Sequence, residues 1–463
     1  MHKGHASHDE HVGDRFTMID KQTLKLRCSE AIDQNREAIL AFADDIYRHP
    51  EMGYHEFRST EKMKEVFQQL GLAVEDGIAY TGCSAKAGRE DGPVVAIMGE
   101  LDSLNCPDHP DCDANGNVHS CGHHAQLAYL YGCAVGLVQS GVLPSLDGAV
   151  KFIAIPAEEY VDADYRSSLV AQGKIQYYGG KQEYLLRGGM DDVDMVLQSH
   201  LINTQSKDIV CCLDTDCDGF IGKSVRFIGR AAHAGLAPSE GINALNMAQL
   251  ALNGIHTLRE TFRDEDKVRV SAIITKCGEM INTVPAEAEM QLMVRAASLD
   301  AMLDSSRKVD RALKAGALAI GGKVEIQNQI GYLPLHSSRE LTAVYKENVK
   351  NYLGCTDSAF IPQYVSAGST DLGDISHIVP CMHIWTGGIS GALHASDFKV
   401  TDQEAAFILP AKMMAMTVIA LLFDKAGCAK AVMDAFHPVF TKEEYLAFLQ
   451  EHSGLDFFDG STL

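Results

Sequence analysis

Short apolar runs alternate with longer, helix-like segments through the first 200 residues. Val94 to Met98, Val150 to Ile155 and Met195 to Gln198 are brief and almost wholly apolar, as buried parallel strands are. Ala125 to Val138, between the first two runs, is helix-like. The segment from about Asp20 to Leu70, before all three runs, carries apolar residues at helical spacing, which predicts amphipathic helix. The pattern predicts an α/β domain, an open mixed sheet with helices on both faces.

The pattern changes after about Cys217. Strands are expected at Lys223–Ile228, Val268–Thr275, Ala288–Arg295 and Lys323–Gln327, and helices at Gly241–Leu258 and Leu299–Gly316. The order strand-helix-strand-strand-helix-strand is typical of a ferredoxin-like α+β sandwich. Since the α/β pattern resumes after Leu335, we expect residues 218–333 to form an inserted, smaller domain. Residues 1–217 and 334–463 then form the two parts of the larger one.

Two segments bear on whether the chain carries a membrane span or a targeting signal. Ala405 to Phe423 is nearly long enough to cross a membrane, but it contains Pro410 and Lys412 and has polar flanks, which favours a buried helix. The first five residues, Met1 to His5, have no apolar run behind them, so a frayed polar leader is expected.

Composition excludes several classes of protein. A chain of 463 residues is expected to hold two cores, and its net charge of −22 argues against a nucleic-acid partner. Thirteen cysteines are too sparse for a secreted disulfide scaffold. With no signal-peptide pattern, a cytoplasmic protein with reduced thiols and no membrane partner is expected.

The hexapeptide His119-Ser120-Cys121-Gly122-His123-His124 concentrates metal-binding side chains. Cys121 and His123 are two apart in a loop that precedes a helix, so both can face one ion, and a thiolate with an imidazole suits zinc or another borderline metal. A local structural zinc knuckle is the alternative, because further Cys and His side chains cluster here: Cys106, His109, Cys112 and His119.

Further candidate ligands lie far downstream. Glu158-Glu159 follows a buried strand and a proline, so one carboxylate can bind a metal while the other takes a proton from the bound water. A solvated pair is the ordinary interpretation of two adjacent glutamates. His200 alone is typical of a core histidine, whereas His394 follows a Gly-rich loop of the kind that approaches ligands closely.

These residues resemble the aminoacylase/carboxypeptidase superfamily of dinuclear metallohydrolases. The resemblance is strongest to the amidohydrolase branch that includes indole-acetyl-amino-acid, hippurate and aminobenzoyl-glutamate hydrolases. Besides the Cys-Gly-His motif, its markers are Leu101-Asp102, Pro156-Ala157-Glu158-Glu159, Ala231-Ala232-His233-Ala234-Gly235, Asn282-Thr283-Val284-Pro285, Gly368-Ser369-Thr370-Asp371 and Leu393-His394. It spans nearly the whole chain.

The resemblance implies a role for each matching residue. Two divalent cations, zinc or manganese with cobalt or nickel as alternatives, would be held by Cys121, His123, Glu159, His200 and His394. Glu158 would be the general base and acid, and Asp102 would orient a ligand imidazole. His233 would reach the active site of the other protomer in a homodimer, although a surface histidine is the alternative. Asn282 and Arg295 would hold the substrate carboxylate.

The chain departs from the pattern of the branch in three places. His124 stands where Asp or Asn is usual, Gln126 replaces a histidine, and residues 160–190 lengthen the segment between Glu159 and His200. On this interpretation the function is hydrolysis of N-acyl or N-aroyl amino acids. A dipeptidase or carboxypeptidase on the same scaffold, and a catalytically degenerate metal-binding protein, stay open as alternatives.

Overall fold

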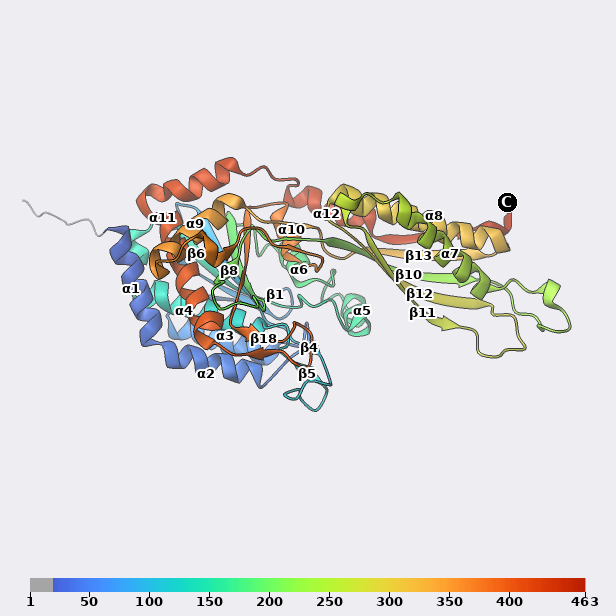
Figure 1. Ribbon diagram of the computed structural model, residues 1–463, viewed down its shortest axis with the longest axis horizontal. Coiled ribbons are helices and arrows are strands. Elements are labelled where there is room, and N and C mark those ends of the chain that lie inside the picture. The colour runs from blue at the N-terminus through green and yellow to red at the C-terminus, as the bar shows by residue number, and fades with distance from the viewer. Residues whose placement is uncertain (1–19, 463) are drawn as a thin grey trace, which may run out of the picture.

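The computed structural model describes residues 20–462, which form a larger part and an elongated smaller part (Figure 1). The predicted leader, Met1 to His5, lies outside these residues. The larger part is built on an eight-stranded sheet with the order β1-β2-β6-β3-β7-β17-β8-β15. Its strands are β1 Val74–Ile78, β2 Gly82–Gly88, β6 Ala149–Ile155, β3 Val94–Glu100, β7 Met195–Leu201, β17 Cys381–Thr386, β8 Cys211–Cys212 and β15 Phe360–Ile361.

The central strands β6, β3, β7 and β17 are parallel, and β1 and β2 add antiparallel pairs at one edge. Every residue of β3 is buried. Its Val95 and Ile97 join one apolar core, whereas Ala96 and Met98 join another, because successive side chains of a strand point to opposite faces. Two covered faces explain the uninterrupted apolar run in the sequence.

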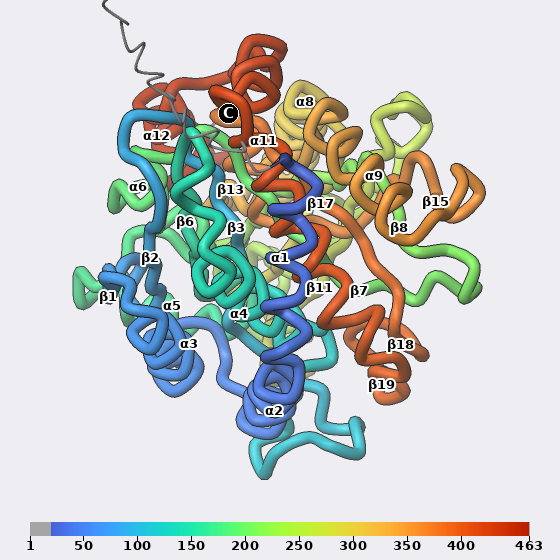
Figure 2. Tube along the Cα trace, turned by 90° about the vertical axis from the view of Figure 1, so that its left-hand side faces the viewer, coloured from blue at the N-terminus to red at the C-terminus, as the bar shows by residue number. Residues whose placement is uncertain are grey.

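Helices cover both faces of this sheet, which confirms the predicted mixed α/β architecture. On one face α4 packs against β3 and β7 and is flanked by α1, α2 and α11 (Figure 2). On the other face α6 contacts β6 and α10 contacts β17. Their bounds are α1 Lys21–Gln34, α2 Arg36–Tyr47, α4 His123–Gln139, α6 Gly180–Leu186, α10 Leu372–Ser376 and α11 Leu409–Ala435.

The segment from Asp20 to Leu70 forms three helices, where the sequence predicts amphipathic helix without a break. α1 and α2 are separated at Asn35, and α3 (Phe57–Gln69) follows a non-helical stretch. Apolar spacing is preserved across a short break when each helix packs on the same core, so periodicity alone does not locate such breaks.

The smaller part is the predicted ferredoxin-like sandwich. Its sheet has the order β11-β12-β10-β13-β20, and α7 and α8 pack on one face. The bounds are β10 Gly219–Ile228, α7 Ala244–Leu258, β11 Arg269–Cys277, β12 Glu287–Ala296, α8 Leu299–Ile320, β13 Lys323–Ile330 and β20 Gly454–Asp459.

The last strand, β20, pairs with β13 in this smaller sheet. The sequence predicts that all of 334–463 belongs to the larger domain, but the segment after α12 (Lys442–His452) crosses to the smaller part and ends there (Figure 1). Lys314 and Lys323 fix the strand through ion pairs with Asp456 and Asp459. The strand is only six residues long and its partner lies about 130 residues earlier, so the local sequence does not show which sheet it joins.

The apolar segment near residue 410 is buried, as predicted. Glu404–Ala435 is long and apolar enough to cross a membrane by length and composition, but 83% of its most apolar window is buried inside the protein. Its axis breaks at Phe423–Ala426, where the backbone leaves helical geometry. α11 contacts α1, α4 and α9 (Arg339–Leu353), so it is a central helix of the larger core.

Candidate metal centre

The predicted ligands meet at the carboxyl ends of the central strands and the N-terminus of α4. Glu159 follows β6, His200 is the penultimate residue of β7, and His123 is the first residue of α4. Gly122 caps that helix with φ of 94°, a left-handed conformation that glycine adopts without strain. The tight turn brings Cys121 and His123, on either side of the glycine, into the same group of candidate ligands.

Five side chains from four distant segments form one cluster. The Sγ atom of Cys121 lies 3.3 Å from Nε2 of His200 and 3.2 Å from Nε2 of His394, whose Nε2 is 3.0 Å from Oε1 of Glu159. Three sets of three ligand atoms are close enough to hold an ion: Cys121, His123 and His200; Cys121, Glu159 and His394; and Glu100, His123 and Glu158. The first two sets share the cysteine, so the five predicted ligands can hold two adjacent ions.

Unpartnered atoms support metal binding by this cluster. Nε2 of His123 and Oε1 of Glu159 are buried and make no hydrogen bond, although each has a polar neighbour, Oε2 of Glu100 at 3.1 Å and Nε2 of His394 at 3.0 Å. Buried polar atoms are normally partnered, and these two belong to the candidate ligand sets. Burial also raises the pKa of the Cys121 thiol well above its usual range, so a thiolate there requires a neighbouring cation. Sulfur, imidazole and carboxylate are the ligands expected for a borderline divalent metal.

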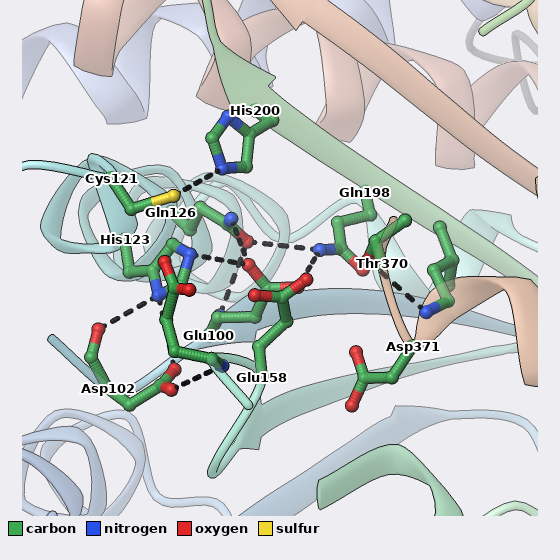
Figure 3. Close-up of polar contacts among 12 residues, drawn as sticks. Glu100, Asp102, Cys121, His123, Gln126, Glu158, Gln198, His200, Thr370 and Asp371 are labelled. Atoms are coloured by element: carbon green, nitrogen blue, oxygen red, sulfur yellow. Dashed lines mark hydrogen bonds and ion pairs between the residues drawn. The ribbon is translucent and has the colours of Figure 1, made fainter. Parts of the chain in front are cut away.

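Asp102 orients two of the candidate ligands. Nδ1 of His123 lies 2.8 Å from the carbonyl oxygen of Asp102 and 3.1 Å from its Oδ1, so Nδ1 carries the proton and the Nε2 lone pair is left for a metal. The other carboxylate oxygen of Asp102 accepts a 2.8 Å hydrogen bond from the backbone N–H of Glu159. Figure 3 shows Asp102 behind His123, on the side away from Cys121.

The two adjacent glutamates have opposite pKa shifts. Burial, with the neighbouring carboxylates of Glu100, Glu159 and Asp371, raises the pKa of Glu158 well above its usual range. For Glu159 burial is the largest influence and acts in the same direction, but His394, His123 and Cys121 together outweigh it and lower the pKa. The environments therefore favour an ionised ligand at Glu159 and a proton carrier at Glu158.

The loop that carries both glutamates is fixed by side chains from elsewhere. Ala157, just before them, has φ of 55°, which is strained for a residue with a Cβ atom. Its backbone N–H donates to Oε1 of Glu56 at 2.8 Å. The hydroxyl of Tyr332 donates to the carbonyl of Glu158, and the guanidinium of Arg166 donates to that of Glu159.

A cavity of about 360 Å³ opens onto the cluster. It is lined by ligands of the cluster, by Glu158 and by aromatic and apolar side chains that include Phe220, Tyr332 and Trp385. Arg295 also lines it, and its Nη1 donates a 2.8 Å hydrogen bond to Oγ of Ser369. Thus the structure brings Arg295 to the cavity that the cluster lines.

His233 and Asn282 lie elsewhere in this chain. Both are in loops beyond the far ends of β10 and β11, and neither lines the cavity. β10 is ten residues long, so these loops lie about 30 Å from the junction with the larger part. The Nδ1 atom of His233 accepts the backbone N–H groups of Gly235 and Leu236, which fixes the ring on the surface.

The local zinc knuckle is not formed. Among residues 20–462, no group of close ligand atoms includes Cys106, His109, Cys112 or His119. Nε2 of His109 lies 3.0 Å from the carbonyl of Phe398, and Sγ of Cys112 donates to that of Pro107.

The two departures near the motif face the interior. His124 is buried, packs against Tyr47 and Phe407, and belongs to no ligand group among the described residues. The side-chain NH₂ of Gln126 donates to Oε2 of Glu100 at 2.6 Å, and Oε1 of Gln126 accepts a hydrogen bond from the backbone N–H of Glu100.

A buried charge network behind the cluster was missed by reasoning from the sequence. Glu100 lies at the end of β3, and its Oε2 is 3.1 Å from Nε2 of His123. Lys181, in the lengthened segment 160–190, forms ion pairs with Glu100 and Asp371. Two members carried a signal in the sequence: Glu100 stands two residues before Asp102 at the end of a buried strand, and Asp371 belongs to one of the markers of the resemblance.

Several known proteins are similar to this chain. Residues 218–320 match the peptidase dimerisation domain. The chain is 27% identical to the Xaa-Arg dipeptidase of Mus musculus, over 88% of this chain and 90% of the relative. It is 28% identical to one of the subunits of p-aminobenzoyl-glutamate hydrolase from Escherichia coli, over 62% of this chain and 56% of the relative. A dinuclear metal-binding peptidase of the M20 family from Bacillus subtilis has a similar structure, with a TM-score of 0.63, 21% identity, and coverage of 84% of this chain and 99% of that one.

These relatives confirm the resemblance to the amidohydrolase branch that the sequence predicts. They also support a hydrolase that acts on amide or peptide bonds.

Proposed function

We propose that this chain is a metal-dependent amidohydrolase that cleaves the amide bond of N-acyl or N-aroyl amino acids. The observation that carries the proposal is the pair of ligand sets sharing Cys121, with the buried Glu158 and the cation of Arg295 in the same cavity. The cavity therefore combines a metal cluster, a proton carrier and a carboxylate-binding group.

Two divalent cations would be held by the cluster. Zinc or manganese fits the mixed set of thiolate, imidazole and carboxylate, and cobalt and nickel are alternatives. Such ions, when bound, lower the pKa of a water molecule and polarise a carbonyl.

Glu158 would transfer the proton between the two halves of the reaction. It would take a proton from the attacking water and give it to the leaving nitrogen when the amide bond breaks. Its raised pKa favours the protonated form, in which the carboxyl group holds the proton that it returns to the leaving nitrogen. Arg295, held by Ser369, would bind the carboxylate of the leaving amino acid.

The cavity favours an uncharged acyl group over a basic side chain. Tyr160, Phe220 and Tyr332 pack edge to face in its wall, with ring centroids 5.1 to 5.7 Å apart. The acidic residues that line the cavity within the described chain are Glu158 and Glu159, and both already have roles. A bound arginine side chain would therefore find no free carboxylate from this protomer. Because one relative is an Xaa-Arg dipeptidase, dipeptide hydrolysis is the second candidate.

A homodimer would complete each site. The outer strand of the smaller sheet, β11, has one unpaired edge, and large apolar side chains are exposed on it and beyond it: Ile273, Ile274, Met280 and Ile281. An exposed strand edge is a template for pairing with a second chain. In such a dimer His233 and Asn282 would extend to the cavity of the other protomer.

An assay with matched substrates tests the proposed reaction. Protein reconstituted with Zn²⁺ or Mn²⁺ would be given p-aminobenzoyl-glutamate, N-benzoyl and indole-acyl amino acids, and Xaa-Arg dipeptides. We expect kcat/KM for an acyl amino acid to exceed that for the dipeptides by about tenfold or more. Higher kcat/KM for the dipeptides would favour the second candidate. Stoichiometric metal with no turnover of any of these amides would contradict both.

A further inference from the structure

The lengthened segment between Glu159 and His200 places a buried lysine behind the metal centre. Lys181 lies in the first turn of α6 and has no exposed surface. The preceding Gly180 allows this approach, because a Cβ atom there would lie 1.6 Å from the carbonyl oxygen of Pro156. α6 therefore starts directly against the loop that carries Glu158 and Glu159.

Lys181 connects two buried carboxylates. Its Nζ lies 2.7 Å from Oε1 of Glu100 and also forms an ion pair with Oδ1 of Asp371. Its backbone N–H donates to Oδ2 of Asp371 at 2.9 Å. All three side chains are at most 1% exposed. Two carboxylates buried this deeply need a cation between them, because charged groups are costly to bury without a partner.

The first carboxylate leads to the metal centre. Besides Lys181, Glu100 accepts hydrogen bonds from Gln126 at 2.6 Å and Gln198 at 2.5 Å, which hold the carboxylate in one position. Its Oε2 is 3.1 Å from Nε2 of His123, the candidate ligand atom. Figure 3 shows Glu100 at the middle of this network, between His123 and Gln198.

The second carboxylate leads to the substrate side of the cavity. Asp371 ends the loop in which Thr370 lines the cavity and Ser369 accepts the hydrogen bond of Arg295. Asp371 lies apart from His123 and Cys121, next to Thr370 (Figure 3). One cation therefore fixes both the network behind His123 and the loop that holds Arg295.

We propose that Lys181 is a positioning residue that holds the metal centre and the carboxylate-binding loop in a fixed relation. The part of this inference that concerns the loop rests on the proposed function, in which Arg295 binds the substrate carboxylate. The part that concerns the network behind His123 does not. On this proposal the lengthened segment, residues 160–190, contributes Lys181 to the functional site.

Metal affinity provides a test that does not depend on turnover. Trp385 is the only tryptophan of the chain, and its ring centroid lies 4.7 Å from that of His200, so its fluorescence reports Zn²⁺ binding at the cluster. We expect Lys181→Met to weaken Zn²⁺ binding and to raise KM for p-aminobenzoyl-glutamate, each by about tenfold.

Lys223→Met is the matched control. Lys223 is a buried lysine of the smaller domain, paired with Asp310 at 2.6 Å, and among the described residues it neither lines the cavity nor contacts a candidate ligand. Its loss should lower the melting temperature and leave Zn²⁺ affinity and KM unchanged. The double variant Lys181→Met/Asp371→Asn removes one charge of each sign, so it keeps the fold testable if Lys181→Met is unstable.

The outcomes separate the possibilities. Weaker Zn²⁺ binding and higher KM in the double variant, with a melting temperature near that of the wild type, support the positioning role. Wild-type Zn²⁺ affinity and KM in either Lys181 variant would overturn it, since the lysine would then only balance charge. A wild-type protein that binds Zn²⁺ but hydrolyses no amide would contradict the proposed function, while the Zn²⁺ titration would still decide the role of Lys181.

Discussion

The sulfur atom of Cys121 lies 3.2 Å from Nε2 of His394, although 273 residues separate them in the chain. The left-handed turn at Gly122 and the positive φ of His394 both act to close this contact. The backbone N–H of His394 also donates to the carbonyl of Ser120 at 3.0 Å, which ties the two loops together beside the cluster. The shared thiol is therefore the feature on which both ligand sets depend.

Replacement of Cys121 by alanine should remove metal from both sites at once. The cysteine belongs to the two ligand sets that contain Glu159, His200 and His394, so neither of these two sets retains three ligands without it. We expect the metal content measured by elemental analysis to fall from two ions per chain towards zero. Cys112→Ala is the control, because that thiol belongs to no ligand set of the described residues. Retention of one full equivalent of metal in Cys121→Ala would show that the thiol does not bridge the two ions.

Glu158→Gln should abolish turnover and leave metal content near that of the wild type. The change keeps the shape of the side chain but removes the group that carries the proton, so kcat should fall by about 100-fold or more. Glu159→Ala and His123→Ala should instead lose metal. Substantial hydrolysis by metal-loaded Glu158→Gln would exclude Glu158 as the general base.

Arg295→Met should raise KM by about tenfold or more for substrates with a free carboxylate, because a guanidinium that pairs with a carboxylate is lost. The corresponding substrate amide, which lacks this charge, serves as the control, and its KM should change little. An equal rise in KM for both substrates would show that Arg295 maintains the cavity and does not bind the carboxylate.

Glu56 should make the folded state less stable as the pH rises. Burial, and then the neighbouring Asp102, raise the pKa of Glu56 to about 8, whereas a glutamate in the unfolded chain titrates near 4.5. The folded state therefore binds the proton more tightly than the unfolded chain does. The stabilisation that this proton binding gives the folded state is complete below about pH 4.5 and is lost as the pH rises to about 8. Its size is on the order of 5 kcal/mol.

The variant Glu56→Gln removes this titration, since the amide keeps an acceptor for the N–H of Ala157 but holds no proton to lose. The melting temperature of the variant relative to the wild type should rise between pH 5 and pH 9. Glu61→Gln, an exposed position, should show no such trend. Parallel pH curves for wild type and Glu56→Gln would contradict the raised pKa.

Much of this fold and site could be predicted because the informative residues stand at the ends of strongly patterned strands. Asp102, Glu159 and His200 each follow a largely apolar run, and parallel strands bring their carboxyl ends to one edge. Lys181 gives no such signal, because its burial depends on two carboxylates, 81 and 190 residues away, that the finished fold brings to it. The strand β20 was missed for a related reason: its partner is chosen by tertiary packing and not by its own sequence.

The dimer can be tested with two inactive variants. In the proposed dimer each site uses Glu158 of one chain and His233 of the other, so Glu158→Gln and His233→Ala should each be inactive alone. In a mixed dimer, one site receives an intact Glu158 and an intact His233, while the other site lacks both. Equal mixing makes half of the dimers mixed, so about a quarter of wild-type activity should return after the protomers exchange.

The control for this experiment mixes Glu158→Gln with Glu159→Ala. Both changes affect the same chain's contribution to its own site, so no arrangement of the two chains restores an intact site. No recovery is expected in that mixture. If Glu158→Gln and His233→Ala failed to complement while co-purification of differently tagged chains showed that they exchange into mixed dimers, His233 would have no role across the interface. The loop at the far end of β10 would then be a surface feature, as the histidine's position within a single chain suggests.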